Sequence, residues 1–145
     1  MSITSTLVDH HKHCDQIFAD AEEACANGDW AAAEKAFGLL NDQLEKHFAS
    51  EEDILFPAFE AATGMRSGPT EVMRVEHRQM SDLLTKMKGL LAARSADDFG
   101  GAAETLLILM QQHNLKEENI LYPMCDRVLG GSDVAATVAK SLQAA

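Results

Sequence analysis

The chain is 145 residues long, enough for one domain with a single sizeable hydrophobic core. Hydrophobic residues make up 46% and charged residues 24%, and the formal net charge of −11 would repel a phosphate backbone, which excludes nucleic acid as an expected partner. The longest strongly apolar run, around residues 106–110, is too short to cross a membrane, and the amino terminus lacks the basic and apolar regions of a signal peptide.

The cysteine content indicates the redox compartment. Cys14, Cys25 and Cys125 are odd in number and show no Cys-x-x-Cys spacing. Such a set does not read as a disulfide framework. We therefore expect a reduced protein in the cytoplasm.

The chain reads as helical from end to end. Three prolines and nine glycines leave long stretches that are dominated by strong helix formers, and no alternating Val/Ile/Thr run predicts a strand. Glycine, proline and serine divide the chain at residues 28–29, 64–69, 95–101 and 130–132. The predicted helices cover residues 5–27, 30–62, 69–94 and 99–129, followed by a short helix over 132–142.

Apolar residues recur at alternating intervals of three and four in each long segment, which is the spacing of a helical bundle seam. The second and fourth predicted helices contribute Leu40, Leu44, Ile54 and Ala58, and Leu106, Met110, Ile120 and Met124. The pattern predicts an all-α protein: an antiparallel up-down four-helix bundle with a short C-terminal helix, in one domain covering residues 1–145.

Ionisable side chains interrupt these seams at positions that should face the core. Buried without partners, each would cost roughly several kcal/mol, so something must compensate them. The six residues are His11, His47, Glu51, His77, His113 and Glu117.

An internal repeat relates these positions. The segment HFASEEDILFP at residues 47–57 returns as HNLKEENILYP at 113–123, a shift of 66 residues, and the same shift carries His11 to His77. The sequence therefore predicts two helical hairpins related by a pseudo-two-fold axis. Each hairpin supplies two histidines and one carboxylate.

This set of side chains fits two adjacent metal ions. Four imidazoles and two carboxylates exceed the four ligands of a structural zinc site. In His-x-x-x-Glu the two side chains lie one helical turn apart on one face, so both reach one centre. Imidazole with carboxylate favours iron, with manganese, zinc or cobalt as alternative occupants.

The order of these motifs resembles the hemerythrin-like, or HHE cation-binding, domain. It is carried by His11, by His47-Phe-Ala-Ser-Glu51, by His77 and by His113-Asn-Leu-Lys-Glu117. The resemblance implies a four-helix bundle around a non-haem diiron centre. In that centre His11 and His47 would hold one iron, His77 and His113 the other, and Glu51 and Glu117 would bridge them beside an oxo or hydroxo group.

One position departs from the oxygen-carrying members of that family. They have a fifth histidine one turn after the third-helix histidine, where this chain has Ser81 after His77. A hydroxyl is a poor iron ligand, so this position would stay open or hold water. The departure favours chemistry with peroxide, nitric oxide or oxygen over reversible oxygen carriage.

Three classes of function stay open from the sequence. The leading hypothesis is a monomeric or weakly dimeric diiron protein that binds or senses oxygen, nitric oxide or peroxide, or stores iron. The second is an oxidoreductase acting on peroxide, as a catalase does, or an iron donor for iron–sulfur repair. By family resemblance, repair proteins carry an additional N-terminal cysteine-bearing domain, which this sequence does not show. The third is a bundle that uses metal only to fold.

Several neighbours of the six residues have competing interpretations. His10 also lies on a plausible seam, but the repeat favours His11 as the ligand and places His10 and His13 at the surface. The second glutamate of each motif, Glu52 or Glu118, is expected to face outward, with acceptance of an imidazole N–H as a secondary role. Phe56 and Tyr122 are expected to pack. The prolines that follow them, Pro57 and Pro123, are expected to kink or end their helices.

Overall fold

The computed structural model describes residues 1–143, and these are helical without a strand, which confirms the predicted all-helical class. Within this range no helix is both long and apolar enough to cross a membrane. The elements are α1 (Ile3–Ala26), α2 (Trp30–Ser50), η1 (Glu51–Leu55), α3 (Phe56–Thr63), α4 (Pro69–Ala92), α5 (Ala96–Lys116), η2 (Glu117–Leu121), α6 (Tyr122–Leu129) and α7 (Val134–Gln143).

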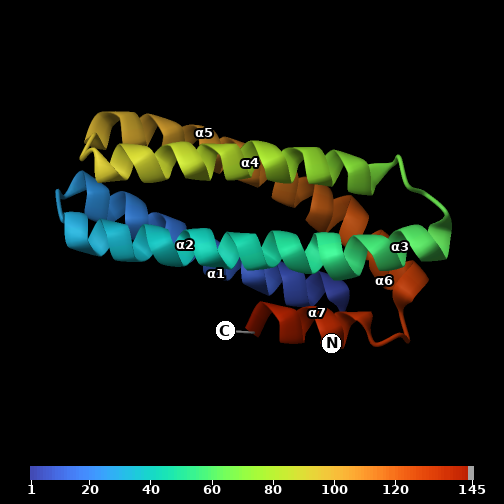
Figure 1. Cartoon of the computed structure of the whole chain (residues 1–145). Helices are drawn as coiled ribbons and strands as arrows, with labels where there is room; N and C mark the ends of the chain where they lie inside the picture. The colour runs from blue at the N-terminus through green and yellow to red at the C-terminus, as the bar shows by residue number, and fades with distance from the viewer. Residues whose placement is uncertain (144–145) are drawn as a thin grey trace.

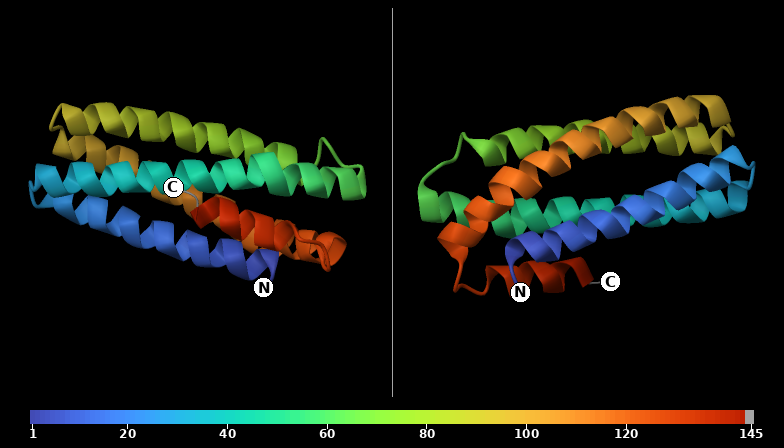
Figure 2. Two further views of the ribbon diagram at one scale, coloured as in Figure 1. Left: turned by 60° about the horizontal axis from the view of Figure 1, so that its bottom comes forward. Right: turned by 180° about the vertical axis from the view of Figure 1, so that it is seen from behind.

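The long helices lie alongside one another in pairs (Figure 1). Helix α1 packs against α2 and α5, and α4 packs against α5 and α2. The α1–α2 and α4–α5 turns lie at one end of the molecule, and the α3–α4 connection lies at the other. Helix α7 lies against α1 and α2 beside the amino terminus (Figure 2).

Local capping explains where the helices begin and end. The Ser2 side chain accepts a hydrogen bond from the amide of Ser5 and begins α1, and Asp29 does the same for Ala32 at the start of α2. Gly64, at φ 75°, ends α3 in the left-handed conformation that glycine adopts without steric cost. Asp29 and Gly64 agree with the punctuation predicted from the sequence, whereas α1 begins at Ile3, before the predicted start at residue 5.

A π-turn interrupts each of the two helices that carry the His-x-x-x-Glu motifs. The amide of Phe56 donates to the carbonyl of Glu51, and that of Tyr122 donates to Glu117, so each bond spans five residues. Pro57 lies just beyond Phe56 and has no amide hydrogen to continue an α-helical ladder. The repeated prolines therefore follow a widened turn beyond which the chain continues as helix, so helical structure does not end at either proline.

The π-turns also shift the register of the buried face. Ile120, expected on the seam, is 57% exposed, and Ile54 is only half-buried. The wider turn rotates the helix beyond it, so Leu55 and Leu121 point inward in their place. Uniform 3.6-residue periodicity does not anticipate this rotation.

The core consists of two apolar clusters on either side of a polar layer. One cluster takes its residues from the half of the molecule with the α1–α2 and α4–α5 turns, and includes Cys14, Leu44, Met80 and Met110. The other includes Leu7, Leu55, Met73 and Leu121. The ionisable residues predicted from the sequence lie between these two sets along each helix.

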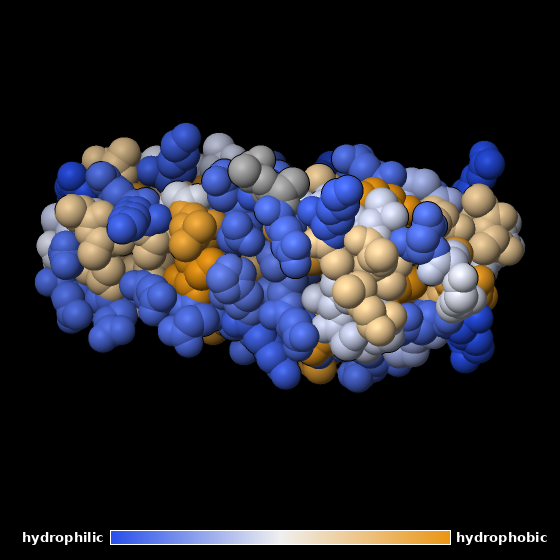
Figure 3. All heavy atoms as spheres, turned by 90° about the horizontal axis from the view of Figure 1, so that it is seen from below, coloured by the Kyte–Doolittle hydropathy of each residue, from blue (hydrophilic) through white to orange (hydrophobic). Residues whose placement is uncertain are grey.

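The surface agrees with the strong negative charge of the chain. The face seen in Figure 3 is mostly hydrophilic, and its hydrophobic residues form small separate groups. Scattered exposed apolar side chains are ordinary for a folded protein.

Asp126 on α6 fixes the start of α1, the helix that carries His11. Its carboxylate accepts hydrogen bonds from the amides of Ile3 and Thr4, at 2.8 and 3.0 Å, and from the Thr4 hydroxyl at 2.6 Å. We predict that Asp126→Ala lowers the free energy of unfolding by about 1–2 kcal/mol because α1 loses this cap. Urea titration measures the change, and Asp42→Ala, on an exposed face of α2, is the control. Equal stability of the two variants would contradict the prediction.

Candidate metal centre

The structure brings all six predicted residues into one layer between the two apolar clusters. Each is at most 5% exposed, and both glutamates are fully buried. The layer contains His11 from α1, His47 from α2, Glu51 from η1, His77 from α4, His113 from α5 and Glu117 from η2.

One half of the layer is formed by His77, His113, Glu51 and Glu117, whose ligand atoms lie within 4.8 Å of one another. Nε2 of His77 is 3.0 Å from Oε1 of Glu51, and Nε2 of His113 is 3.2 Å from Oε1 of Glu117. Among the described residues, four atoms here have no aligned hydrogen-bond partner: the two Nε2 atoms, Oε1 of Glu51 and Oε2 of Glu117.

The other half is formed by His11, His47 and Glu117, whose ligand atoms also lie within 4.8 Å of one another. Nε2 of His11 is 3.2 Å from Oε1 of Glu117, and Nε2 of His47 is 3.6 Å from Oε1 of Glu51. Glu117 therefore belongs to both halves, and Glu51 lies close to a histidine of each.

Tyr122, which was expected from the sequence to pack, lies in this second half. Its side chain is fully buried, and its hydroxyl lies 2.6 Å from Oε2 of Glu51 and 2.9 Å from Oε1 of Glu117. The same oxygen is 3.2 Å from Nε2 of His11 and 3.3 Å from Nε2 of His47. The sequence signal for this position of Tyr122 is that the first repeat has Phe56 at the same motif position, so only the second repeat carries a hydroxyl there.

The second glutamate of each motif holds a histidine of the opposite hairpin. Nδ1 of His11 donates to Glu118 at 2.6 Å, and Nδ1 of His77 donates to Glu52 at 2.6 Å. Both carboxylates are partly buried. Glu52 and Glu118 therefore do not simply face outward. Each accepts an imidazole N–H, which was the secondary role expected from the sequence. These bonds orient the rings and make Nε2 the inward-facing nitrogen.

Each of the other two histidines is held by the residue immediately before a predicted ligand histidine. Glu76, before His77, holds His113, and His10, before His11, holds His47. Nδ1 of His113 donates to Glu76 at 2.8 Å. Nδ1 of His47 lies 2.8 Å from Nδ1 of His10, whose Nε2 is 3.0 Å from Oε1 of Gln43. His10 is therefore buried in the structure, contrary to the surface position predicted for it, while His13 is exposed.

Tautomers follow from these partners. The amide oxygen of Gln43 accepts only, so His10 donates from Nε2 and its Nδ1 must accept from His47. Burial, followed by the nearby charge of His47, lowers the pKa of His10 to about 4, which keeps it neutral at pH 7. In their neutral forms all four inward histidines thus turn the Nε2 lone pair toward the two glutamates.

Lone pairs that converge in a buried layer fit a cation. Buried polar atoms are normally paired, and the unpartnered atoms of His77, His113, Glu51 and Glu117 face one another instead. Imidazole nitrogen and carboxylate oxygen are suitable ligands for iron, manganese and zinc. The residues present in each half therefore fit a metal ion, and Glu117 belongs to both halves.

Without a cation, protons must balance the carboxylates. Burial opposes protonation of His113, but the charge and hydrogen bond of Glu117 outweigh it and raise the pKa to about 9. The same balance raises the pKa of His11 and His77. Burial would raise the pKa of Glu51, yet the charge of His47 and hydrogen bonds hold it well below its ordinary value.

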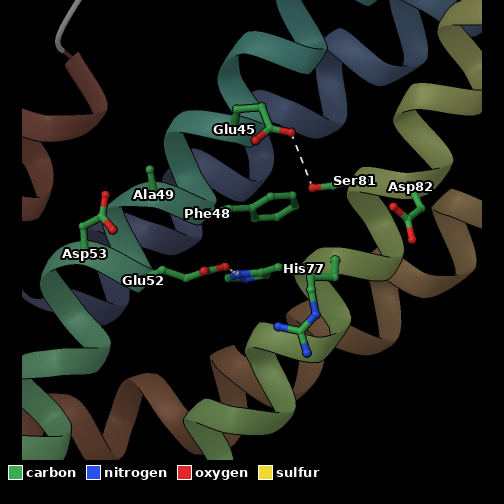
Figure 4. Close-up of a pocket in the computed structure, with 9 residues that line it drawn as sticks. Glu45, Phe48, Ala49, Glu52, Asp53, His77, Ser81 and Asp82 are labelled. Atoms are coloured by element: carbon green, nitrogen blue, oxygen red, sulfur yellow. Dashed lines mark hydrogen bonds and ion pairs between the residues drawn. The ribbon is translucent and has the colours of Figure 1, made fainter.

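A surface pocket of about 420 Å³ reaches the His77 side of the layer. Figure 4 shows Phe48 and His77 projecting into the space between α2 and α4, with Ser81 one turn beyond His77. The Ser81 hydroxyl lies 3.4 Å from Glu45 and does not contact the buried layer. The position one turn after His77 is thus occupied by a short side chain at the pocket wall.

Comparison with known families agrees with this geometry. The family model of the hemerythrin HHE cation binding domain matches residues 2–125. Three similar proteins are each named iron-sulfur cluster repair protein YtfE. Those of Edwardsiella ictaluri, Salmonella schwarzengrund and Escherichia coli O81 are 33%, 29% and 29% identical to this chain over 106, 107 and 106 residues.

These matches are partial in both directions. They cover 66–67% of this chain and 46–47% of each relative, so the chain spans about half the length of the relatives it matches. No solved structure gives a significant match.

The pKa shifts predict how the stability of the metal-free protein depends on pH. Imidazolium forms of His113, His11 and His77 stabilise the fold fully below the ordinary pKa of 6.5, and each contribution is lost as the pH rises through the raised pKa of that histidine, which is about 9 for His113. The Glu51 carboxylate contributes above its ordinary pKa of 4.5, and this contribution is lost as the pH falls. We therefore expect maximal stability between pH 4.5 and 6.5.

Urea unfolding in the presence of a chelator, from about pH 5 to pH 9, measures this effect. His113→Gln is the control, because it removes the imidazolium whose pKa is raised to about 9 and should flatten the alkaline side of the profile. Metal-loaded protein should instead gain stability as the pH rises, because protons compete with metal for the same nitrogens. Metal-free protein that is as stable at about pH 9 as at about pH 6.5 would contradict the prediction.

The two adjacent histidines of α1 should respond differently to substitution. His11→Ala removes an inward Nε2, whereas His10→Ala removes only the acceptor of the His47 N–H. We expect His11→Ala to lose most of one bound metal ion per chain, and His10→Ala to weaken metal binding by about 10–100-fold at most. Metal content after dialysis measures both. Equal losses in the two variants would contradict this assignment.

Proposed function

This chain belongs to the hemerythrin HHE cation-binding domain family, and we propose that it is a non-haem iron protein whose buried layer holds two iron ions. His11 and His47 would bind one ion and His77 and His113 the other, with Glu51 and Glu117 shared between them. When bound, iron would supply a Lewis-acidic and redox-active centre; zinc or manganese are alternative occupants.

One observation carries this proposal: two glutamates lie between two pairs of inward-facing histidines in a layer that has no internal source of positive charge except protons. Oε1 of Glu51 and Oε2 of Glu117 have no hydrogen-bond partner among the described residues. One divalent ion would balance the charge of both carboxylates, but two ions are needed to use every inward lone pair. A single ion would leave the inward Nε2 atoms of one histidine pair without a metal partner.

We further propose the architecture expected for this family: an antiparallel up-down four-helix bundle, in one domain covering residues 1–145. The alternating positions of the connections support it (Figure 1). A reducing, cytoplasmic location is part of the proposal, and is supported by three buried cysteines that form no disulfide.

The open side of the centre suggests a small ligand. The pocket beside His77 is lined by Phe48, Arg78 and Ser81, and the Phe48 ring stacks on the His77 imidazole at 4.3 Å between centroids. An ion held by His77 and His113 would therefore have a ring and a hydroxyl on that side, and no further imidazole. Oxygen, nitric oxide and peroxide match the size and chemistry of such a position. We propose that the protein binds or senses a ligand of this class.

Iron donation is the second candidate, because the similar proteins are named for iron–sulfur cluster repair. For this role at least one ion must leave readily, and the pocket beside His77 offers the path. The two roles differ in how long iron is retained, which a competing chelator measures.

Iron analysis and ligand titration test the proposal together. We expect about two iron ions per chain after reconstitution, and a change in the optical spectrum when azide or nitric oxide is added. Ser81→His places an imidazole one turn after His77, where it can occupy the open side. We expect this variant to keep its iron and to bind azide at least about tenfold more weakly, a change of about 1.4 kcal/mol.

Ser81→Ala is the matched control and should bind azide as the unmodified protein does. Fewer than one metal ion per chain after careful reconstitution would refute the two-iron proposal. Two ions with no response to azide or nitric oxide would refute the ligand-binding role. Rapid transfer of one ion to a chelator would favour donation.

A further inference from the structure

We propose that the Tyr122 oxygen is a third kind of protein ligand in the centre and binds the ion held by His11 and His47, which makes the two ions inequivalent. This inference rests on the proposed two-iron function and adds a phenolate to the predicted ligands. It also assigns the open coordination position to the other ion, held by His77 and His113.

The distances around the hydroxyl support this role. The Tyr122 oxygen is nearly equidistant from the three ligand atoms of this half: 3.2 Å from His11, 3.3 Å from His47 and 2.9 Å from Glu117. Ligands in neighbouring positions around one ion, with bond lengths near 2.1 Å, lie about 3 Å apart. The phenol oxygen therefore has the spacing of a further ligand of the same ion.

Hydrogen bonds from the Tyr122 hydroxyl cannot satisfy all four of the polar atoms around it. A phenol has one proton, and the shortest contact, 2.6 Å to Glu51, is where it is donated. With His11 and His47 in the neutral forms that bind metal, the contacts with His11, His47 and Glu117 then bring lone pairs together. One cation at the meeting point of these lone pairs would satisfy all of them.

The π-turn is what brings Tyr122 to this place. In an α-helix a residue five positions after Glu117 would point about 140° away from it. Because the amide of Tyr122 donates to the carbonyl of Glu117, residue 122 lies almost one full turn on and projects from the same face. The glutamate and the phenol therefore reach the layer together.

Charge comparison between the two repeats gives independent support. The 66-residue shift relates Glu118 to Glu52, His10 to Glu76 and Tyr122 to Phe56. The half with His77 has two carboxylates behind its histidines, whereas the half with His11 has one carboxylate and the neutral His10. A phenolate at Tyr122 restores the missing negative charge. Lys116 also contacts Glu76, but its ammonium is half exposed and screened by water.

Phe56 shows what the equivalent position does without a hydroxyl. Its ring is fully buried and stacks on His77 at 5.8 Å between centroids. It offers no ligand atom, and the residue one turn after His77 is Ser81 at the pocket wall. One ion would thus gain a ligand from Tyr122 that the other lacks.

Ligation by Tyr122 is a simple proton exchange. The metal–oxygen bond forms as the phenolic O–H bond breaks, the proton leaves to the buffer, and no electron is transferred. The process needs no reagent beyond the metal ion.

Resonance Raman spectroscopy of the protein loaded with Fe(III) tests the proposal, since iron(III) phenolates give a visible charge-transfer band with enhanced ring vibrations. The chain has one tyrosine, so any phenolate signal belongs to Tyr122. We expect the signal in the unmodified protein, and expect Tyr122→Phe to lose it and to release one of its two ions to a chelator at least about tenfold faster. Phe56→Leu, at the equivalent position of the other repeat, is the control and should retain the signal.

Phenylalanine already occupies the equivalent position 56, so Tyr122→Phe should preserve the fold, and circular dichroism checks this. Unmodified protein that contains two Fe(III) ions but shows no phenolate vibrations would overturn this inference and leave the two-iron proposal standing. Unmodified protein that binds no iron would overturn both. Iron content, measured on the same samples, separates the two results.

Discussion

The structure depends on one constraint: six ionisable groups are buried in a single layer between two apolar clusters. In that layer neither Glu51 nor Glu117 is in contact with water, and the nearest sources of positive charge are the histidines. Every other feature of the layer serves this balance. Outer carboxylates fix the tautomers of His11, His77 and His113. His10 does the same for His47, and the π-turn after Glu117 brings Tyr122 into the layer.

The repeat makes the centre symmetric in its ligands and asymmetric in their surroundings. The same 66-residue shift relates all the predicted ligands, yet it pairs His10 with Glu76 and Tyr122 with Phe56. Both differences fall on groups that touch a ligand. If the layer holds two ions as proposed, their different neighbours would let them perform different tasks.

Much of this could be predicted from the sequence, because helix propensity, breakers and buried polar positions are local signals. The all-helical class, the breaks near Gly64 and Asp29 and the inward position of the six residues needed no tertiary information. The roles of Glu52, Glu118 and His10 did, because each contacts a residue in another helix. The register beyond residue 51 and the position of Tyr122 depended on the π-turns, which uniform helical periodicity does not reveal. Whether the six residues bind metal remains a prediction.

The crossed contacts of the motif glutamates have a consequence for assembly. Glu52 of the first hairpin holds His77 of the second, and Glu118 of the second holds His11 of the first. This reciprocity, in which each partner offers the same patch and receives the same contact, is that of an isologous two-fold dimer. In each hairpin, one of the two histidines donates its Nδ1–H to a glutamate of the other hairpin. The chain therefore resembles a dimer of two halves joined by a short connection. Separating the halves would remove the outer support of both, and joining them lets one half diverge without losing its partner.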